Sequence, residues 1–268
     1  MQSKSMLAAA LLWAGFANAA ATVKSEYGEI KGGKWQFPGV AAQARSSLAS
    51  TASLSIVVGK LHAESGSPAS LVNGVVNVNA GTTEEVVFFD NACVDGGKLL
   101  MDLGKAQPIR QIDSYSYHTW NVDQGSRTPQ VYSLYGSAAD KADPADLAGW
   151  TKIAEVDSRP NQTGQGWGGH PHCVQIADAA GADLGSFRYL LFVIKPTLSP
   201  LLNGRQTAGE AWSNTFFTEI NVHNADTLAK AVPAKLFTTC ANLEEIILVY
   251  KSHFDIGYTH LFRLHWFQ

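Results

Sequence analysis

The stretch Leu99–Ser137, "LLMDLGKAQPIRQIDSYSYHTWNVDQGSRTPQVYSLYGS", decides the fold class of this chain. It contains short runs of β-branched, aromatic and alternating residues, and Gly, Pro, Asn and Asp separate these runs. Within Gln111–Ser116, alternate residues fall on opposite sides of an extended chain, which is typical of a strand with one buried face. The stretch therefore predicts several short strands joined by tight turns.

Runs of the same kind extend outward over residues 53–223 with hardly any helical periodicity. They read "LSIVVGKLHA", "EEVVFFD", "WTKIAEVD", "CVQIAD", "FRYLLFVIK" and "FFTEINVH". Many short strands with turn signals favour an all-β sandwich or barrel, and we favour a sandwich.

The order of several motifs resembles the discoidin or F5/8 type C domains, which are galactose-binding-like (jelly-roll) β-sandwiches. The motifs run from "LVNGV" at Leu71–Val75 through Asp102-Leu103-Gly104-Lys105, Ile109, Ile112, Arg127, Pro129, Tyr132 and Tyr135-Gly136-Ser137 to Trp150, Phe187-Arg188-Tyr189-Leu190 and Thr218-Glu219-Ile220. The resemblance covers some 150 residues and implies a mainly β fold. Asp102 and Gly104 are first of all turn residues, because Gly admits positive φ and a carboxylate accepts backbone N–H groups.

The resemblance implies where a sugar site would lie. Sugar-binding sandwiches of this kind hold the sugar on loops at one end, where an aromatic ring covers the apolar face of the sugar and polar side chains form hydrogen bonds with its hydroxyls. Three segments supply such residues. The candidate ligand-binding residues are His118, Trp120, Asn121, Arg127, Trp167, Trp212 and Asn214. Two alternatives stay open: Arg127 pairs with a carboxylate inside the fold, or Trp120 and Trp167 pack over the sandwich end.

Asp90, Asn91 and Asp95 offer oxygen ligands of the kind that calcium prefers, although such residues are also ordinary in turns. Three cysteines occur in the chain, and an odd count leaves one unpaired. We prefer a disulfide between Cys93 and Cys173, with three unpaired, buried cysteines as the alternative.

The first residues have the pattern of a secretory signal peptide: Lys4, an apolar run over 6–16 and then Ala17-Asn18-Ala19. We therefore expect residues 1–19 to be cleaved and the mature chain to be secreted or periplasmic, with no membrane span. The formal net charge of −3 argues against a nucleic-acid partner. A glycan or polysaccharide is the expected partner, and we expect a monomer.

After His223 the composition changes, and Ile246–Tyr250 is a continuous apolar run that suits a strand buried on both faces. His253 and Asp255 follow it, at a spacing that puts both side chains on one side of an extended chain. The string Val249–Thr259 resembles the first strand and metal loop of glycoside hydrolase family 38, the α-mannosidases. The resemblance implies that His253 and Asp255 are two ligands of a catalytic zinc ion. No catalytic residue is expected in this chain.

These observations predict five parts: a signal peptide (1–19), a segment of unknown role (20–52), the sandwich (53–223), a linker (224–243) and the start of an α/β catalytic domain (244–268). We expect the N-terminal part of a secreted, zinc-dependent glycosidase that carries a sugar-binding sandwich. The alternatives are a stand-alone sugar- or cell-surface-binding module and a purely structural sandwich.

Overall fold

The computed structural model describes residues 21–40, 44, 47–77, 79, 82–90, 92–118, 128–159, 170–197 and 215–230, and the backbone of 235–237. The chain forms two units, residues 1–238 and 239–268, and every described residue lies in the first. The expected signal peptide and the expected glycosidase-like segment both lie outside the described residues, so both stay predictions.

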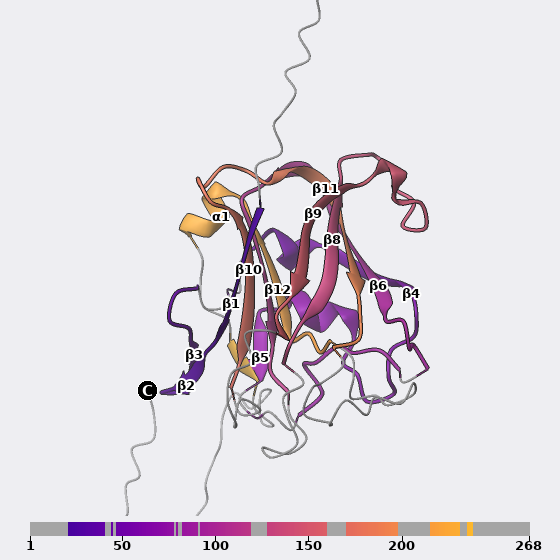
Figure 1. Cartoon of the computed structure of the whole chain (residues 1–268). Coiled ribbons are helices and arrows are strands. Elements are labelled where there is room, and N and C mark those ends of the chain that lie inside the picture. Colours follow the sequence, from indigo (N-terminus) through magenta and orange to yellow (C-terminus); the bar gives the residue numbers. More distant parts are fainter. Residues whose placement is uncertain are drawn as a thin grey trace, which may run out of the picture. The chain divides into compact units, whose positions relative to one another are not determined.

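Alternating residues build two antiparallel sheets (Figure 1). The four-stranded sheet has the order β1-β10-β7-β12, which are Ala21–Tyr27, His172–Asp178, Gln111–Ser116 and Glu219–His223. The five-stranded sheet has the order β4-β6-β11-β8-β9, which are Ser53–Val58, Gly97–Ile109, Gly185–Ile194, Val131–Ser137 and Thr151–Asp157. The mainly β sandwich that the sequence predicts is confirmed.

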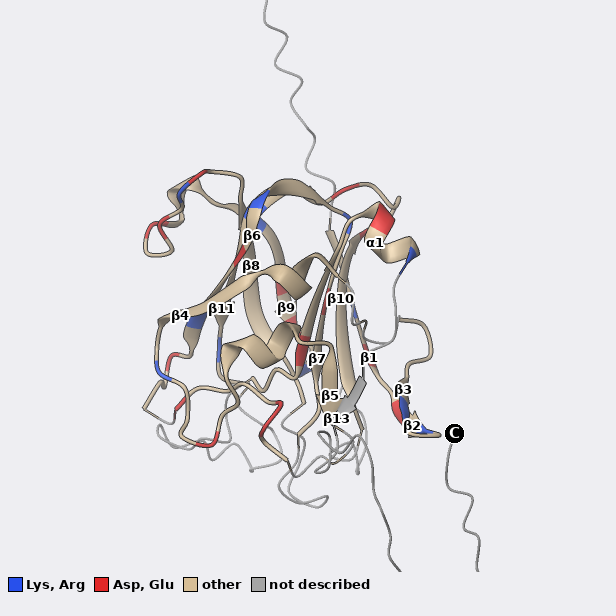
Figure 2. Cartoon of the chain, turned by 180° about the vertical axis from the view of Figure 1, so that it is seen from behind, with Lys and Arg blue, Asp and Glu red and all other residues tan. Residues whose placement is uncertain are grey.

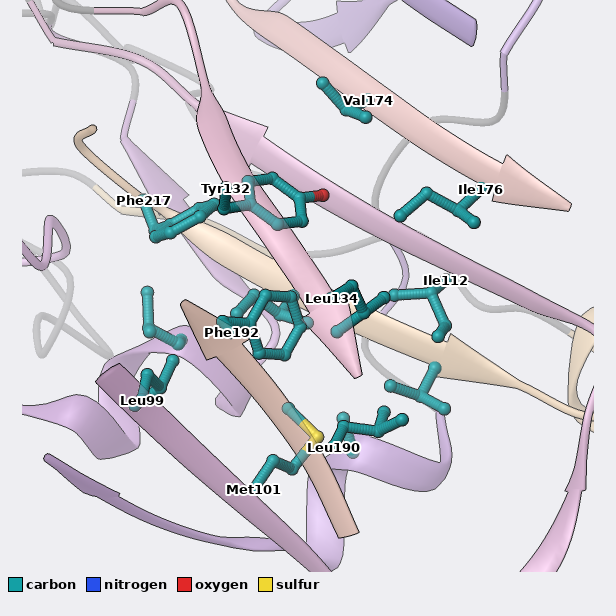
Figure 3. Close-up of a cluster of buried hydrophobic side chains, with 14 of the residues drawn as sticks. Leu99, Met101, Ile112, Tyr132, Leu134, Val174, Ile176, Leu190, Phe192 and Phe217 are labelled. Atoms are coloured by element: carbon teal, nitrogen blue, oxygen red, sulfur yellow. The ribbon is translucent and has the colours of Figure 1, made fainter. Parts of the chain in front are cut away.

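One apolar core lies between the two sheets (Figure 3). Ile112, Val174 and Ile176 extend from the four-stranded sheet, while Leu190 and Phe192 extend from the five-stranded sheet. All five side chains are fully buried. Burial of a large aliphatic or aromatic side chain stabilises a fold by about 1.5–3 kcal/mol, so this shared core holds the sheets together.

Short elements surround the sheets. They are β2 (Glu29–Lys31), β3 (Lys34–Gln36), η1 (Leu48–Thr51), η2 (Pro68–Val72), β5 (Val75–Asn77), η3 (Leu147–Gly149), α1 (Ala225–Ala229) and β13 (Lys235–Phe237). Asn224 caps α1, because its side chain accepts from the Thr227 amide at 2.8 Å. β13 pairs in parallel with β5. The expected linker over 224–243 thus contains a short helix and a strand.

An ion pair joins two of the motifs on which the family resemblance rests. Arg188 on β11 donates from Nε and from one terminal nitrogen to the two carboxylate oxygens of Asp102 on β6, each at 2.9 Å. The same carboxylate accepts the Gly104 amide at 2.7 Å, and Gly104 has a φ of +80°, which favours glycine. Asp102 therefore fixes the backbone within β6 and holds β6 to β11, and the expected turn at Asp102 and Gly104 is wrong, because β6 continues to Ile109 with only a shift of register against β11.

The expectation of a single buried face is wrong for β7, because all six of its residues are buried. Gln111, Asp113 and Tyr115 point away from the sandwich core, on what we call the outer face of the four-stranded sheet. Residues 28–40 together with Ala44, which we call the strap, cover this face around Tyr115 and Cys173 and contact it at Asn221. Trp35 and Val40 of the strap pack with Tyr115, Tyr117 and Cys173 in a second core cluster.

The segment 20–52 had no predicted role, and the structure assigns it one. It contributes β1, which pairs with β10, and it contributes the strap. Another difference concerns "EEVVFFD", which is predicted as a strand. Its residues make only isolated bridges, Val87 with Phe217 and Phe89 with Leu61.

Acidic and basic residues are interspersed over the strands and turns of the described part (Figure 2). The formal net charge of the whole chain is −3. Within the described ranges, none of the helices has the length and apolarity needed to cross a membrane.

Trp35→Ala tests whether the strap is integral to the fold. Trp35 is 2 % exposed, and its indole N–H donates to the Asn77 carbonyl at 2.9 Å. We expect a loss of about 3–5 kcal/mol in the free energy of unfolding, measured by urea denaturation. Trp150→Ala, in an exposed turn, is the control and should cost much less. Equal losses for the two variants would show that the strap adds no stability of its own.

Candidate functional site

All three segments with candidate sugar-binding residues connect the two sheets at the same end of the sandwich. They join β7 to β8, β9 to β10 and β11 to β12, so each one passes from one sheet to the other. In the four-stranded sheet His172 lies opposite Ser116, and Glu219 lies opposite Tyr115. The end of β7 therefore lies beside the start of β10 and the start of β12.

The five-stranded sheet shows the same arrangement. Val131 at the start of β8 lies opposite Asp157 at the end of β9, and Tyr132 lies opposite Ile194 at the end of β11. The Thr215 hydroxyl accepts the Val131 amide at 3.0 Å, which connects the approach to β12 with the start of β8. We call this region, where all three segments begin and end, the loop end.

Most candidate residues lie outside the described part of the chain. These are Trp120, Asn121 and Arg127 in the first segment, Trp167 in the second, and Trp212 and Asn214 in the third. The strand registers bring the ends of the three segments to the loop end. The role of these six side chains in a sugar site stays a prediction. The expected zinc ligands His253 and Asp255 also lie outside the described residues.

His118, the one candidate that the structure describes, is buried at the loop end with 1 % exposure. Its ring stacks on Phe216 at 5.0 Å between ring centroids, and Phe216 stacks on Phe88 at 4.3 Å. On the other side Phe88 stacks with the half-buried ring of His62 at 5.1 Å. The four rings form a series that supports the base of the first and third segments.

Phe88 and Phe216 were not among the candidates, although the sequence carries a signal for them. Each belongs to a Phe-Phe doublet, Phe88-Phe89 and Phe216-Phe217. Neighbouring side chains of an extended chain point to opposite sides. Accordingly Phe89 and Phe217 enter the main core, whereas Phe88 and Phe216 form a separate small cluster.

The interior of the four-stranded sheet becomes polar towards the loop end. Ser114 Oγ donates to Gln130 Oε1 at 2.5 Å and lies 2.8 Å from the Tyr132 hydroxyl. One step nearer to the loop end, Ser116 and His172 lie opposite each other on neighbouring strands. Both are fully buried, and within the described part of the chain the Ser116 hydroxyl has no hydrogen-bond partner.

His172 is held neutral by its surroundings. Burial lowers the pKa of its imidazole to about 3, although a hydrogen bond to the Glu26 backbone opposes this shift. The ring lies against the Tyr27 ring at 4.4 Å between centroids. A buried polar group without a hydrogen bond costs about 1–3 kcal/mol, so Ser116 weakens the loop end of the core.

The predicted disulfide between Cys93 and Cys173 is wrong, because both residues are free cysteines. Cys173 lies on the outer face of the four-stranded sheet, whereas Cys93 packs against the main core on the inner side. A disulfide needs Cα atoms within about 7 Å and converging side chains, and a sheet that lies between two residues prevents this.

Within the described ranges, His, Cys, Asp and Glu side chains form no group of three or more that could hold a metal ion. Of the expected calcium ligands, Asp90 accepts the Ala92 amide at 3.0 Å as an ordinary turn residue, and Asn91 lies outside the described part. The calcium site stays a prediction.

No family model and no curated protein sequence matches the chain. Solved structures with a similar fold include the family 32 carbohydrate-binding module of Clostridium perfringens NanJ in complex with galactose, at 12 % identity and a TM-score of 0.39, with 66 % of this chain and 97 % of that chain covered. The lectin domain of lectinolysin in complex with Lewis B antigen has 14 % identity and a TM-score of 0.39, with 67 % and 98 % covered. A SusE-like protein has 14 % identity and a TM-score of 0.42, with 67 % and 100 % covered.

His172→Phe tests the cost of the neutral buried imidazole. The folded pKa of about 3 lies below the ordinary value of 6.5, so this contribution to stability is complete above pH 6.5 and is lost as the pH falls towards 3. Phe keeps a ring against Tyr27 but cannot take up a proton. Between pH 7 and pH 5 the wild type should lose about 2 kcal/mol relative to the variant, measured by urea denaturation.

His62→Phe is the matched control, since His62 is half-buried and also stacked on an aromatic ring. It should leave the pH dependence of unfolding close to that of the wild type. If His172→Phe and wild type show parallel pH profiles, His172 is not the buried neutral group described above.

Proposed function

We propose that the chain is a secreted or periplasmic carbohydrate-binding module whose sugar site lies at the loop end. The observation that carries the proposal is that three segments, each with a Trp and polar residues, begin and end there. Aromatic rings cover the apolar face of a pyranose, while amide, guanidinium and imidazole groups bond its hydroxyls. The net charge of −3 fits a neutral glycan better than a polyanion.

In this proposal the three segments have different roles. Trp120, Asn121 and Arg127 make one side of the site, Trp167 a second, and Trp212 with Asn214 the third. The stacked rings of His118, Phe216 and Phe88 serve as a rigid base for the first and third segments. Because a preformed base lowers the cost of ordering loops on binding, a small site of this kind can retain useful affinity.

Trp120→Ala and Arg127→Ala test the site. Each should weaken binding in a glycan-array or affinity-electrophoresis measurement by about 1–3 kcal/mol, which is the usual cost of removing an anchor residue. Trp150→Ala is the control, because Trp150 precedes β9 at the opposite end of the sandwich. Its binding should equal that of the wild type.

Unchanged glycan binding in both loop variants would move the site away from the first segment. Arg127→Ala has a separate outcome: a loss of folding would support the alternative in which Arg127 pairs with a carboxylate inside the fold. Thermal unfolding of each variant separates that outcome from a loss of binding.

We further propose that the module belongs to a larger zinc-dependent glycosidase of the α-mannosidase type. Support comes from the string "VYKSHFDIGYT" at Val249–Thr259, in which His253 and Asp255 have the spacing of two metal ligands on one extended strand. The nucleophile, the acid/base residue and the remaining ligands of such a site would have to come from further residues. The alternative is a module that binds glycans without an attached enzyme.

The purified chain should release no mannose from α-mannosides with or without added zinc. Two ligands leave a zinc ion without the third protein ligand that catalytic sites use, and hydrolysis also needs the missing carboxyl groups. A colorimetric α-mannosidase assay at several zinc concentrations checks this. Zinc-dependent release by the chain alone would contradict the proposed division between binding module and enzyme.

A further inference from the structure

Two further connections of the sandwich reach the loop end. β6 begins there, because its first residue Gly97 lies opposite Ile194 at the end of β11. β4 ends there, because its last residue pairs with Lys98 of β6. Residues 59–62 follow β4, and residues 87–90 lie in the connection that precedes β6. Neither piece belongs to the three segments that carry the candidate sugar-binding residues, and the structure describes both pieces.

The two pieces pair with each other, and together we call them the arm. Leu61 and Phe89 form an antiparallel bridge, and both side chains pack in the main core. Two backbone hydrogen bonds flank the bridge, at 3.1 Å from the His62 amide and at 2.7 Å from the Asp90 amide. Alternate residues of an extended chain point to opposite sides, and opposite residues of a pair share a side. The face of the arm that points away from the core therefore carries Lys60, His62, Phe88 and Asp90.

His62 gives this face a ring in a fixed position. The ring stacks on the buried Phe88 ring at 5.1 Å between centroids. Its Nδ1 accepts the Glu64 amide at 3.2 Å, so the neutral imidazole carries its proton on Nε2. The side chain is half-buried. His62 therefore combines a supported aromatic surface with one N–H donor.

Lys60 and Asp90 lie opposite each other on the same face of the arm. Lys60 is exposed and Asp90 is half-buried. Asp90 Oδ1 accepts the Ala92 amide at 3.0 Å, which fixes the carboxylate on a turn. In the part of the chain that the structure describes, no residue bonds Lys60 Nζ, His62 Nε2 or Asp90 Oδ2. The arm thus offers two hydrogen-bond donors and one acceptor beside a stacked ring.

We propose that Lys60, His62 and Asp90 form a second sugar subsite at the loop end, which binds a further residue of a neutral oligosaccharide. The His62 ring contacts the apolar face of a pyranose, and the three polar groups bond its hydroxyls. A cation and a carboxylate side by side favour a neutral sugar, because Asp90 would repel an acidic sugar and Lys60 would repel a charged amino sugar. In this role Asp90 is an alternative to the calcium ligand predicted at the same residue. The inference rests on the proposed sugar-binding function and deepens it.

The position of the arm indicates that the glycan is longer than one sugar. Phe88 stacks with His62 at 5.1 Å and with His118, where the first segment begins, at 6.4 Å. No ring contact joins His62 directly to His118 among the described residues. A pyranose is similar in size to one aromatic ring. A ligand that contacts both the arm and the first segment therefore needs at least two sugar residues.

An array of neutral glycans tests the subsite if it carries each terminal sugar both as a monosaccharide and as the end of a longer chain. The wild type should bind the preferred chain at least about tenfold more tightly than its terminal monosaccharide, since each added hydrogen bond contributes a factor of roughly 2–10. His62→Phe keeps the stacked ring but lacks the N–H. Lys60→Met and Asp90→Asn each remove one polar group. Each variant should lose about three- to tenfold in binding of the chain and bind the monosaccharide as the wild type does.

Matched controls lie in the connection between β8 and β9, which begins and ends at the opposite end of the sandwich. Lys141→Met removes an exposed ammonium group, as Lys60→Met does. Asp143→Asn changes an exposed aspartate whose Oδ1 accepts the Ala145 amide at 2.8 Å, which is the same turn contact that Asp90 makes. Both controls should bind the monosaccharide and the longer chain as the wild type does.

The outcomes separate this subsite from the proposed function. If the wild type retains no glycan, the proposed function fails and the subsite fails with it. If the wild type binds chains no better than monosaccharides, or if its preference persists in all three variants, the second subsite is wrong and the sugar-binding function stands. Variants that lose monosaccharide and chain binding equally would place the arm in the first subsite and overturn the proposal.

Nuclear magnetic resonance of the wild type gives a measurement that does not depend on how the variants fold. Long-range ¹H–¹⁵N spectra should show His62 as the neutral tautomer with its proton on Nε2. Addition of the longest neutral glycan that the array retains should shift the Nε2 signal, whereas the terminal monosaccharide should leave it unchanged. An Nε2 signal that the longer glycan does not move would overturn the proposal.

Discussion

Burial of the four-stranded sheet on both faces is the constraint on which the rest of this structure depends. The inner face of β7 and β10 supplies Ile112, Val174 and Ile176 to the core shared with the five-stranded sheet. The outer face supplies Asp113, Tyr115 and Cys173, which are buried as completely but lie among polar groups. A sandwich needs only the first contact. The second contact requires a covering segment, and the strap covers the outer face around Tyr115 and Cys173.

Much of the sandwich can be predicted from the sequence, because a strand with an apolar core face leaves a period of two in the residues. β4, β6, β7, β8, β9, β10, β11 and β12 each overlap a predicted run, although several begin one or two residues before it. The segment before residue 53 could not be predicted in this way. β1 is an edge strand with exposed Thr22, Val23 and Lys24, so it carries hardly any apolar alternation. The polar outer residues of β7 look like solvent-facing residues, and the segment that covers them is far away in the sequence.

The candidate site, too, could be predicted from the sequence only in part. Sequence patterns and the family resemblance locate three segments, and the strand registers bring these together at one end. The base beneath them depends on tertiary contacts that a linear pattern does not reveal. His118 has the residue type of a sugar ligand, yet its ring is buried against Phe216. The two Phe-Phe doublets were a usable signal, because an extended chain must send the members of a doublet to opposite sides.

Each of the three segments at the loop end starts on one sheet and finishes on the other, and this topology has a consequence for how the protein can change. The strand registers are fixed by pairs within each sheet, so a segment that only crosses between sheets can gain or lose residues without shifting any register. Doubling the length of such a loop costs only about 0.6 kcal/mol in closure entropy. The binding end can therefore be diversified by insertion and deletion, one loop at a time, while the framework that carries it keeps its sequence.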